Sequence, residues 1–103
     1  MAKFRVSCVA ELDLLDIGKY TLRAWGVDQT IRYLDDLEAC CQRLAESPLS
    51  GRPCDHVRSG LRRAEHGKHV VFFRQEPGGI LVSRILHQSM LPERHAIGDE
   101  DES

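Results

Sequence analysis

The chain has 103 residues, of which 42% are apolar, and its formal net charge is −2. This length predicts one domain with a two-layer core. No apolar run approaches the roughly 18 residues that span a bilayer, and charges interrupt the first residues where a signal peptide needs its apolar stretch. These features argue against a membrane protein and predict a cytosolic one.

The first predicted element is a strand over residues 4–10. Phe4, Val6 and Cys8 alternate there with polar residues. An alternation with a period of two is typical of a strand that buries one face.

A helix is predicted from Glu11 to Trp25, because apolar residues change to helical spacing at Leu14, Ile17 and Thr21. Asp13 lies in its predicted first turn, where a carboxylate suits the helix dipole. Gly26 is predicted to end the helix as a C-cap. Tyr20 and Trp25 are interpreted as core or hairpin-seam residues at this spacing.

A second helix is predicted to begin after Asp28, a natural N-cap residue. Its apolar seam recurs at three and four residues through Leu34, Leu37, Cys41 and Leu44. The connection between the helices is short, which predicts that they form an antiparallel hairpin.

Three strands are predicted after the turn-rich segment 47–53, over residues 61–66, 69–74 and 80–86. Tight turns at Gly67 and at 77–79 make these strands antiparallel. With the hairpin on one face, the sequence predicts a two-layer α+β domain with an antiparallel sheet of about four strands. The short basic strand around Arg62 and Arg63 is predicted to be its open edge.

The charge is unevenly distributed along the chain. Residues 51–98 carry eight bases and four acids, whereas the last five residues carry four acids. We therefore predict a single domain over residues 1–97, with one short helical turn within 90–97, and an acidic, disordered tail over 98–103. The tail is interpreted as a solubilising end, and a sharper hypothesis is that it competes with an acidic partner.

The four cysteines, Cys8, Cys40, Cys41 and Cys54, form no CxxC pair. Cysteines without metal-ligand spacing are most simply interpreted as reduced, small apolar side chains. No metal and no cofactor are predicted.

Two groups of residues carry a resemblance to a known family. The first comprises Asp13-Leu14, Tyr20-Thr21, Trp25-Gly26, Tyr33, Leu37 and Gly51-Arg52, and it resembles the helical hairpin of ParE-type toxins. The second comprises residues 67–74, residues 84–90 and His95, and it resembles the sheet half of the same family. The resemblance runs from about Phe4 to His95 and suggests the ParE side of the RelE/ParE (plasmid stabilisation) toxin superfamily.

The resemblance implies the toxin of a type II toxin–antitoxin system with a RelE/ParE-like fold. Such a toxin is expected to poison DNA gyrase and to be held by a cognate ParD-like antitoxin in a hetero-oligomeric complex, without sequence-specific contact to nucleic acid. One alternative is a ribosome-dependent messenger RNA endoribonuclease of RelE type. Another is a non-toxic ParE-like interaction module.

An acidic, amphipathic antitoxin would need an apolar groove edged with arginines, bound either as a helix on the hairpin or as a strand at a sheet edge. The antitoxin-binding candidates are Arg58, Arg62, Arg63, Arg74, Trp25 and Tyr33. The target-binding candidates are Arg84, His87, Met90 and His95.

No catalytic residue is predicted. In the ribonuclease alternative His87 would be the acid or base, and Arg62 and Arg84 would hold the phosphate. Two departures from the RelE pattern weaken that alternative, because His69 stands where an arginine is common and Gln88 where an aromatic residue is common.

Overall fold

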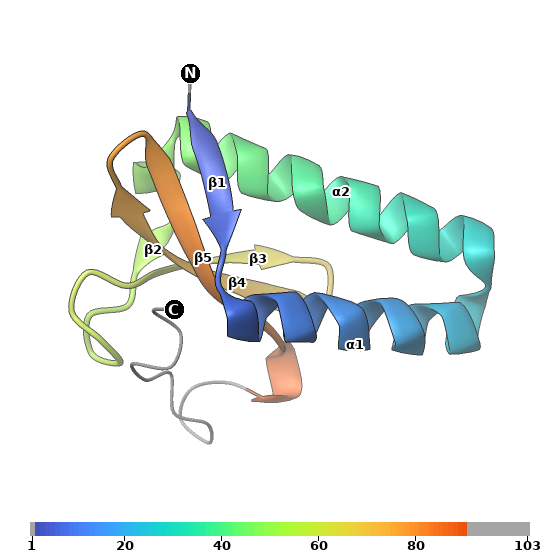
Figure 1. Cartoon of the computed structure of the whole chain (residues 1–103). Coiled ribbons are helices and arrows are strands. Elements are labelled where there is room, and N and C mark those ends of the chain that lie inside the picture. Colours follow the sequence, from blue (N-terminus) through green and yellow to red (C-terminus); the bar gives the residue numbers. More distant parts are fainter. Residues whose placement is uncertain (1, 91–103) are drawn as a thin grey trace.

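A two-layer arrangement of helices on a sheet is seen in the computed structural model, which describes residues 2–90 (Figure 1). The elements are β1 (Lys3–Val6), α1 (Cys8–Trp25), α2 (Val27–Glu46), η1 (Pro48–Ser50), β2 (Arg52–Pro53), β3 (Arg62–His66), β4 (His69–Glu76), β5 (Gly79–His87) and η2 (Gln88–Met90). The strand order is β1-β5-β4-β3-β2, and both long helices pack on the sheet. The predicted α+β class is confirmed. No helix within the described part of the chain is long and apolar enough to cross a membrane.

The sheet has five strands rather than about four, and it is mixed rather than antiparallel. β1 pairs with β5 in parallel, with Phe4 opposite Ile80 and Val6 opposite Val82. Tight turns fix the direction only of the strands that they join, and no turn joins β1 to β5. A Cβ atom on Gly79 would lie 1.7 Å from the backbone oxygen of Lys3, so this pairing requires glycine at that position.

The first strand ends at Val6, so the predicted strand over residues 4–10 was too long. Ser7 caps α1 because its Oγ accepts a hydrogen bond from the Ala10 N–H at 3.0 Å. The same Oγ donates to the backbone oxygen of Ser83 at 2.9 Å, which fixes the start of the helix on β5. The helix therefore begins at Cys8 instead of Glu11.

The two helices meet at Gly26, which ends α1 as predicted. Its φ is 89°, a value that favours glycine, and its N–H donates to the Leu22 oxygen at 3.0 Å. α2 begins at once at Val27, and Asp28 lies in its first turn instead of serving as the N-cap. The helices diverge from this connection toward β1 (Figure 1).

Two apolar clusters lie on opposite faces of the sheet. The larger one lies under the helices and includes Leu37, Val71, Phe73 and Val82. The smaller one lies on the other face, where Val70, Phe72 and Leu86 pack against Cys54 and Leu61. The long loop between β2 and β3 thus covers part of the second face.

The interpretation of Tyr20 and Trp25 as core or seam residues was wrong. Their side chains are 66% and 71% exposed, whereas the buried residues of α1 are Ala10, Ile17 and Thr21. The hairpin extends beyond the end of the sheet (Figure 1).

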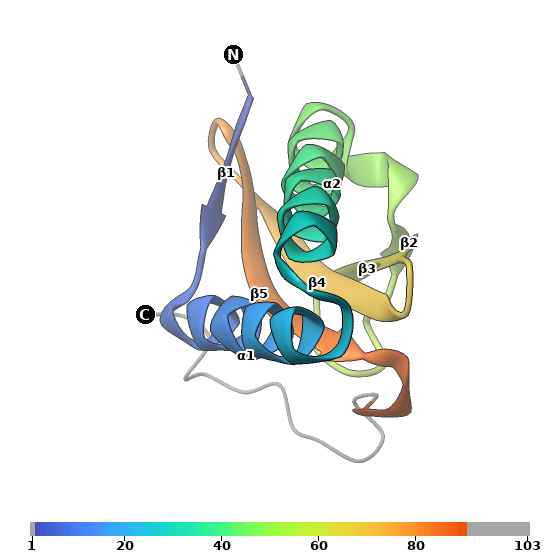
Figure 2. The same ribbon diagram turned by 90° about the vertical axis from the view of Figure 1, so that its right-hand side faces the viewer.

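The basic strand β3 is not a fully open edge. β2 pairs with it, placing Arg52 opposite Arg63 and Pro53 opposite Arg62. β1 lies at the opposite edge of the sheet, and Figure 2 shows it on one side of the hairpin, with the β3–β4 turn and η2 on the other.

Candidate protein-binding groove and histidine cluster

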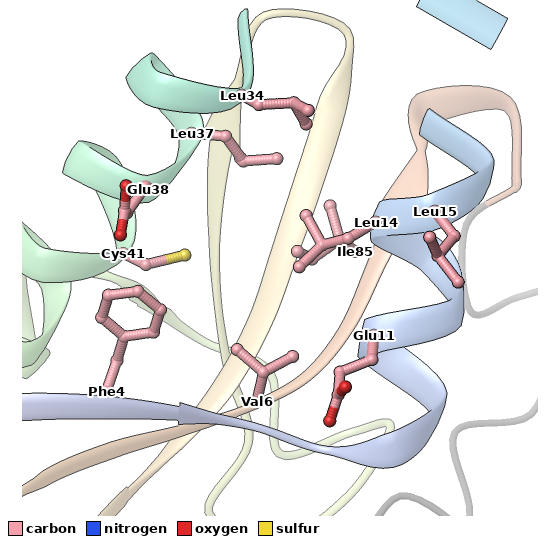
Figure 3. A pocket seen from close by; sticks show the side chains of 10 residues that line it. All are labelled: Phe4, Val6, Glu11, Leu14, Leu15, Leu34, Leu37, Glu38, Cys41 and Ile85. Atoms are coloured by element: carbon pink, nitrogen blue, oxygen red, sulfur yellow. The ribbon is translucent and has the colours of Figure 1, made fainter. Parts of the chain in front are cut away.

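An apolar groove of about 520 Å³ opens between α1, α2 and β1 (Figure 3). Leu14 and Leu15 line it from α1, and Leu34 and Leu37 line it from α2. The groove exists because the two helices diverge from the tip of the hairpin. Nearer the tip they are in contact, since a Cβ atom added to Gly18 would lie 3.8 Å from a methyl group of Leu34. The helices are therefore close near Gly18 and apart near β1.

Strand residues form the floor of the groove. Phe4 and Val6 reach it from β1 and Ile85 from β5. Cys41 also lines it, and burial raises the pKa of this thiol to about 12, so the groove contains a neutral thiol at pH 7. Leu15 is 58% exposed and therefore offers apolar surface that this chain leaves uncovered.

The rim of the groove is acidic. Glu11 of α1 and Glu38 of α2 line it, and in the described part of the chain no lysine or arginine does so. The arginine-edged groove that we expected is therefore not found at this position. A partner segment with apolar residues in the groove would complement the rim with lysine or arginine.

Several arginines lie instead on the sheet face opposite the helices, among them Arg52, which is opposite Arg63. Arg63 is placed there by its pairing with Phe72, over whose ring its guanidinium lies at 5.6 Å. Arg74 follows Phe72 by two residues and is opposite Leu81, which is in turn opposite Arg5. We call Arg5, Arg63 and Arg74 the arginine row.

The arginine row contains two ion pairs, a bidentate one at Arg5 and a longer one in which Arg63 Nη2 lies 3.4 Å from Glu65 Oε2. Arg5 donates two hydrogen bonds to the Glu76 carboxylate, both at 2.7 Å. These hydrogen bonds and the positive charges of Arg5 and Arg74 lower the pKa of Glu76. The row therefore has a carboxylate beside Arg5 and another beside Arg63, and it does not present a purely cationic surface.

Other predicted arginines are used within the fold. The Arg62 guanidinium donates to the Gly51 oxygen, at 3.0 Å from Nε and 2.6 Å from Nη2, and to the Leu49 oxygen at 3.2 Å. Arg84 forms an ion pair with Asp13 of α1 at 2.8 Å. Arg58 is part-buried in the loop between β2 and β3.

A cluster of imidazole and phenol groups lies where β4 begins and β5 ends. His69 pairs with His87 across these strands, and their rings meet edge to face with centroids 5.5 Å apart. The Tyr33 hydroxyl of α2 is 2.6 Å from His69 Nδ1 and donates to the His66 oxygen at 3.2 Å. Two residues from different predicted sites, Tyr33 and His87, are thus parts of one cluster.

The surroundings within the cluster shift the pKa values of His69 and Tyr33. Burial lowers the pKa of His69, and the nearby His87 and His66 lower it further. Burial also raises the pKa of Tyr33. His87 Nδ1 accepts a hydrogen bond from the Ser89 N–H at 3.2 Å, so its neutral form carries the proton on Nε2.

Some expectations fall outside the described residues. These are the side chain of Met90, the position of His95, the helical turn beyond residue 90 and the acidic tail. Within residues 2–90, no group of three or more His, Cys, Asp or Glu side chains could hold a metal ion. Sequence reasoning expected an apolar groove but did not locate it between the two helices. The apolar Leu15 beside the seam of α1 was a signal that this helix has a second apolar side.

Comparison with known proteins identifies one family. Residues 5–92 match the family model described as the ParE toxin of the type II toxin–antitoxin system, parDE. Toxin ParE1 of Caulobacter vibrioides is 41% identical over 97 residues, covering 92% of this chain and 98% of the relative. Toxin ParE1 of Mycobacterium tuberculosis is 37% identical over 95 residues, covering 91% and 97%. Toxin ParE of Escherichia coli is 35% identical over 91 residues, covering 87% and 88%.

A solved structure supports the fold. A chain of the chromosomal ParDE TA system from P. aeruginosa superimposes with a TM-score of 0.70 at 19% identity, covering 84% of this chain and 96% of that one. This likeness concerns the arrangement of helices and strands.

Proposed function

Because the chain belongs to the ParE toxin family of type II toxin–antitoxin systems, we propose that it poisons DNA gyrase in the cytoplasm by binding it and that a ParD-like antitoxin neutralises it. The choice of gyrase rests on the family alone. The observation that supports a role in binding is the apolar groove, in which a chain of this size leaves large aliphatic side chains uncovered.

The groove is the site that we assign to the antitoxin. An amphipathic helix would place its apolar residues against Leu15, Leu34 and Leu37 and its basic residues near Glu11 and Glu38. Burying one leucine-sized side chain contributes about 1.5–3 kcal/mol, so several are needed to exceed the cost of ordering a disordered tail.

The arginine row is a second contact for the same antitoxin. Along β1, Phe4 and Val6 face the groove, while Lys3 and Arg5 point to the opposite face of the sheet. An antitoxin that crosses the edge at β1 can therefore reach both surfaces, and an acidic stretch would pair with Arg63 and Arg74. This arrangement replaces the expected single groove edged with arginines.

One observation favours the ribonuclease alternative, namely the contact between His69 and His87. Two imidazoles can supply an acid and a base. The two arginines assigned to the phosphate are held elsewhere, since Arg62 donates to backbone oxygens and Arg84 to Asp13. The binding function therefore remains the proposal.

Controlled expression from a tightly repressed promoter tests the proposal. We expect DNA damage signalling and filamentation first, and gyrase-dependent DNA breaks with purified components. Purified antitoxin added before gyrase is the control and should prevent the breaks. Immediate arrest of protein synthesis with cleaved messages would overturn the choice of gyrase, and absence of any effect would indicate a non-toxic interaction module.

A variant of His87 separates binding from catalysis. Replacing a general acid or base costs about 10²–10⁴-fold in rate, so a ribonuclease with His87→Ala would lose nearly all message cleavage. A toxin that acts by binding should keep its potency to within about tenfold, the effect of losing roughly one contact of 1.4 kcal/mol.

A further inference from the structure

A second pocket, of about 300 Å³, lies between the hairpin and the β3–β4 turn. This turn is on the side of the hairpin away from β1 (Figure 2). The walls of the pocket include the exposed rings of Tyr20 and Trp25 from α1 and Gln29 from α2. Lys68 of the turn and the paired His69 and His87 complete it. The pocket is thus built from three separate parts of the chain.

The composition of this pocket differs from that of the groove. Among residues 2–90, no aspartate or glutamate lines this pocket, and Lys68 gives it a positive charge. Aromatic faces beside a cation, in a pocket without carboxylates, suit a flat ring that carries a phosphate. The groove has the opposite character, because its walls are aliphatic and its rim is acidic.

A neighbouring pocket of about 380 Å³ shares Tyr20, His69 and His87 with the first. It also contains Asp13, which is paired with Arg84, and Asp16. The carboxylate of Asp16 disfavours a phosphate on that side. A phosphate group would therefore lie near Lys68. Tyr20 lines both pockets, so its ring is available to a ligand in either one.

We propose that the pocket formed by Tyr20, Trp25, Lys68 and the His69–His87 pair binds an unpaired nucleotide of a single-stranded nucleic acid. The base stacks against Trp25 or Tyr20, and its phosphate lies at Lys68. These contacts recognise an aromatic base and a phosphate, which every nucleotide has, so binding does not depend on the base sequence. It goes beyond the proposed function and does not depend on which enzyme is the target.

Trp25 is the only tryptophan of the chain, so its fluorescence reports directly on this pocket. Titration with a short oligothymidylate, in the absence of any other protein, should quench it saturably. Oligouridylate titrated in parallel identifies whether DNA or RNA binds more tightly. Heparin is the control, because it carries negative charge without rings, and it should leave the emission of Trp25 nearly unchanged.

Matched variants separate stacking from charge. Tyr20→Ala should weaken oligothymidylate binding about fivefold or more, the effect of losing one stacked base contact. Lys68→Ala should weaken binding and reduce the slope of log affinity against log salt by about 0.7. Leu12→Ala is the control, because Leu12 is 60% exposed on the same helix and lines none of these pockets.

Three results would overturn the proposal. The first is the absence of quenching by either oligonucleotide, and the second is equal quenching by heparin. The third is quenching by the purified antitoxin alone, which would assign this surface to a protein partner. Folding does not confuse the test, because Tyr20 is mostly exposed and circular dichroism checks each variant.

Discussion

Arg84 of β5 and Asp13 of α1 form a bidentate ion pair, with Nε to Oδ2 at 2.8 Å and Nη2 to Oδ1 at 3.0 Å. Asp13 Oδ2 also accepts the N–H of Ile85 at 2.9 Å. The pairing register between β4 and β5 shifts between Phe72 and Phe73, next to this site. The ion pair therefore fixes α1 to the irregular part of β5.

Replacing Arg84 with Met should lower the free energy of unfolding by about 2–4 kcal/mol, because it leaves a mostly buried carboxylate without its partner. The two side chains are only 19% and 12% exposed. Urea unfolding measures the change. The double variant Arg84→Met with Asp13→Asn should recover part of the loss, and a single variant with unchanged stability would show that the pair contributes nothing.

The ion pair between Arg84 and Asp13 could not be predicted from the sequence. The residues are 71 positions apart, and nothing in either local pattern indicates the contact. We predicted that Asp13 interacts with the helix dipole, because the helix was expected to begin at Glu11 and Asp13 would then lie in its first turn. The Ser7 cap moves that start to Cys8 and places Asp13 in the second turn. Arg84 was predicted to contact a target, and its ion pair with Asp13 was not foreseen.

Local signals were reliable where a single physical cause controls the structure. Gly26 ends α1 because the position needs a positive φ, and the tight turns at Gly67 and Gly78 fix the antiparallel strands. Exposure was predicted poorly, as Trp25 shows, because it depends on how far the hairpin extends past the sheet. The groove is likewise a property of the angle between two helices, which their separate apolar patterns do not determine.

Leu15→Glu tests the antitoxin groove. It should weaken antitoxin binding about tenfold or more, because it removes an apolar contact and places a carboxylate where apolar antitoxin side chains would pack. Stability should change little, since Leu15 is 58% exposed. Isothermal titration calorimetry with the antitoxin tail measures the affinity. Leu12→Glu introduces the same charge on the same helix outside the groove and should have a smaller effect; equal losses would argue against the groove.

The histidine cluster should make stability depend on pH. The pKa of His69 is lowered in the folded state, so the unfolded chain binds more protons and stability rises with pH. The contribution of His69 is complete above its unfolded pKa of about 6.5 and is lost as the pH falls through that value toward the folded pKa. Urea midpoints between about pH 7.5 and 5.5 should therefore decrease.

His69→Gln should flatten this dependence, because it removes the titrating group but keeps a polar side chain near Tyr33. The titratable groups around His69 include His66, His87, Lys68 and Tyr33, and Asp13 and Asp16 of α1 line a pocket with it. His66→Gln is the matched control and should reduce the slope less, because burial is the largest cause of the shift at His69. A slope that His69→Gln leaves unchanged would assign the pH dependence to other groups.

Variants of Arg62 and Arg74 should have opposite effects, the first lowering stability and the second lowering antitoxin affinity. Arg62→Ala removes the hydrogen bonds to the Gly51 and Leu49 oxygens and should cost about 1.5–3 kcal/mol of stability, with little change in antitoxin affinity. Arg74→Gln should do the reverse, weakening the association of an acidic antitoxin at low salt and having less effect as salt screens the charge. Urea unfolding and calorimetry at two salt concentrations measure both quantities for both variants. Because the two arginines lie on opposite faces of the sheet, a loss of affinity in Arg62→Ala alone would place the antitoxin at the turn around Gly51 and contradict the assignment to the arginine row.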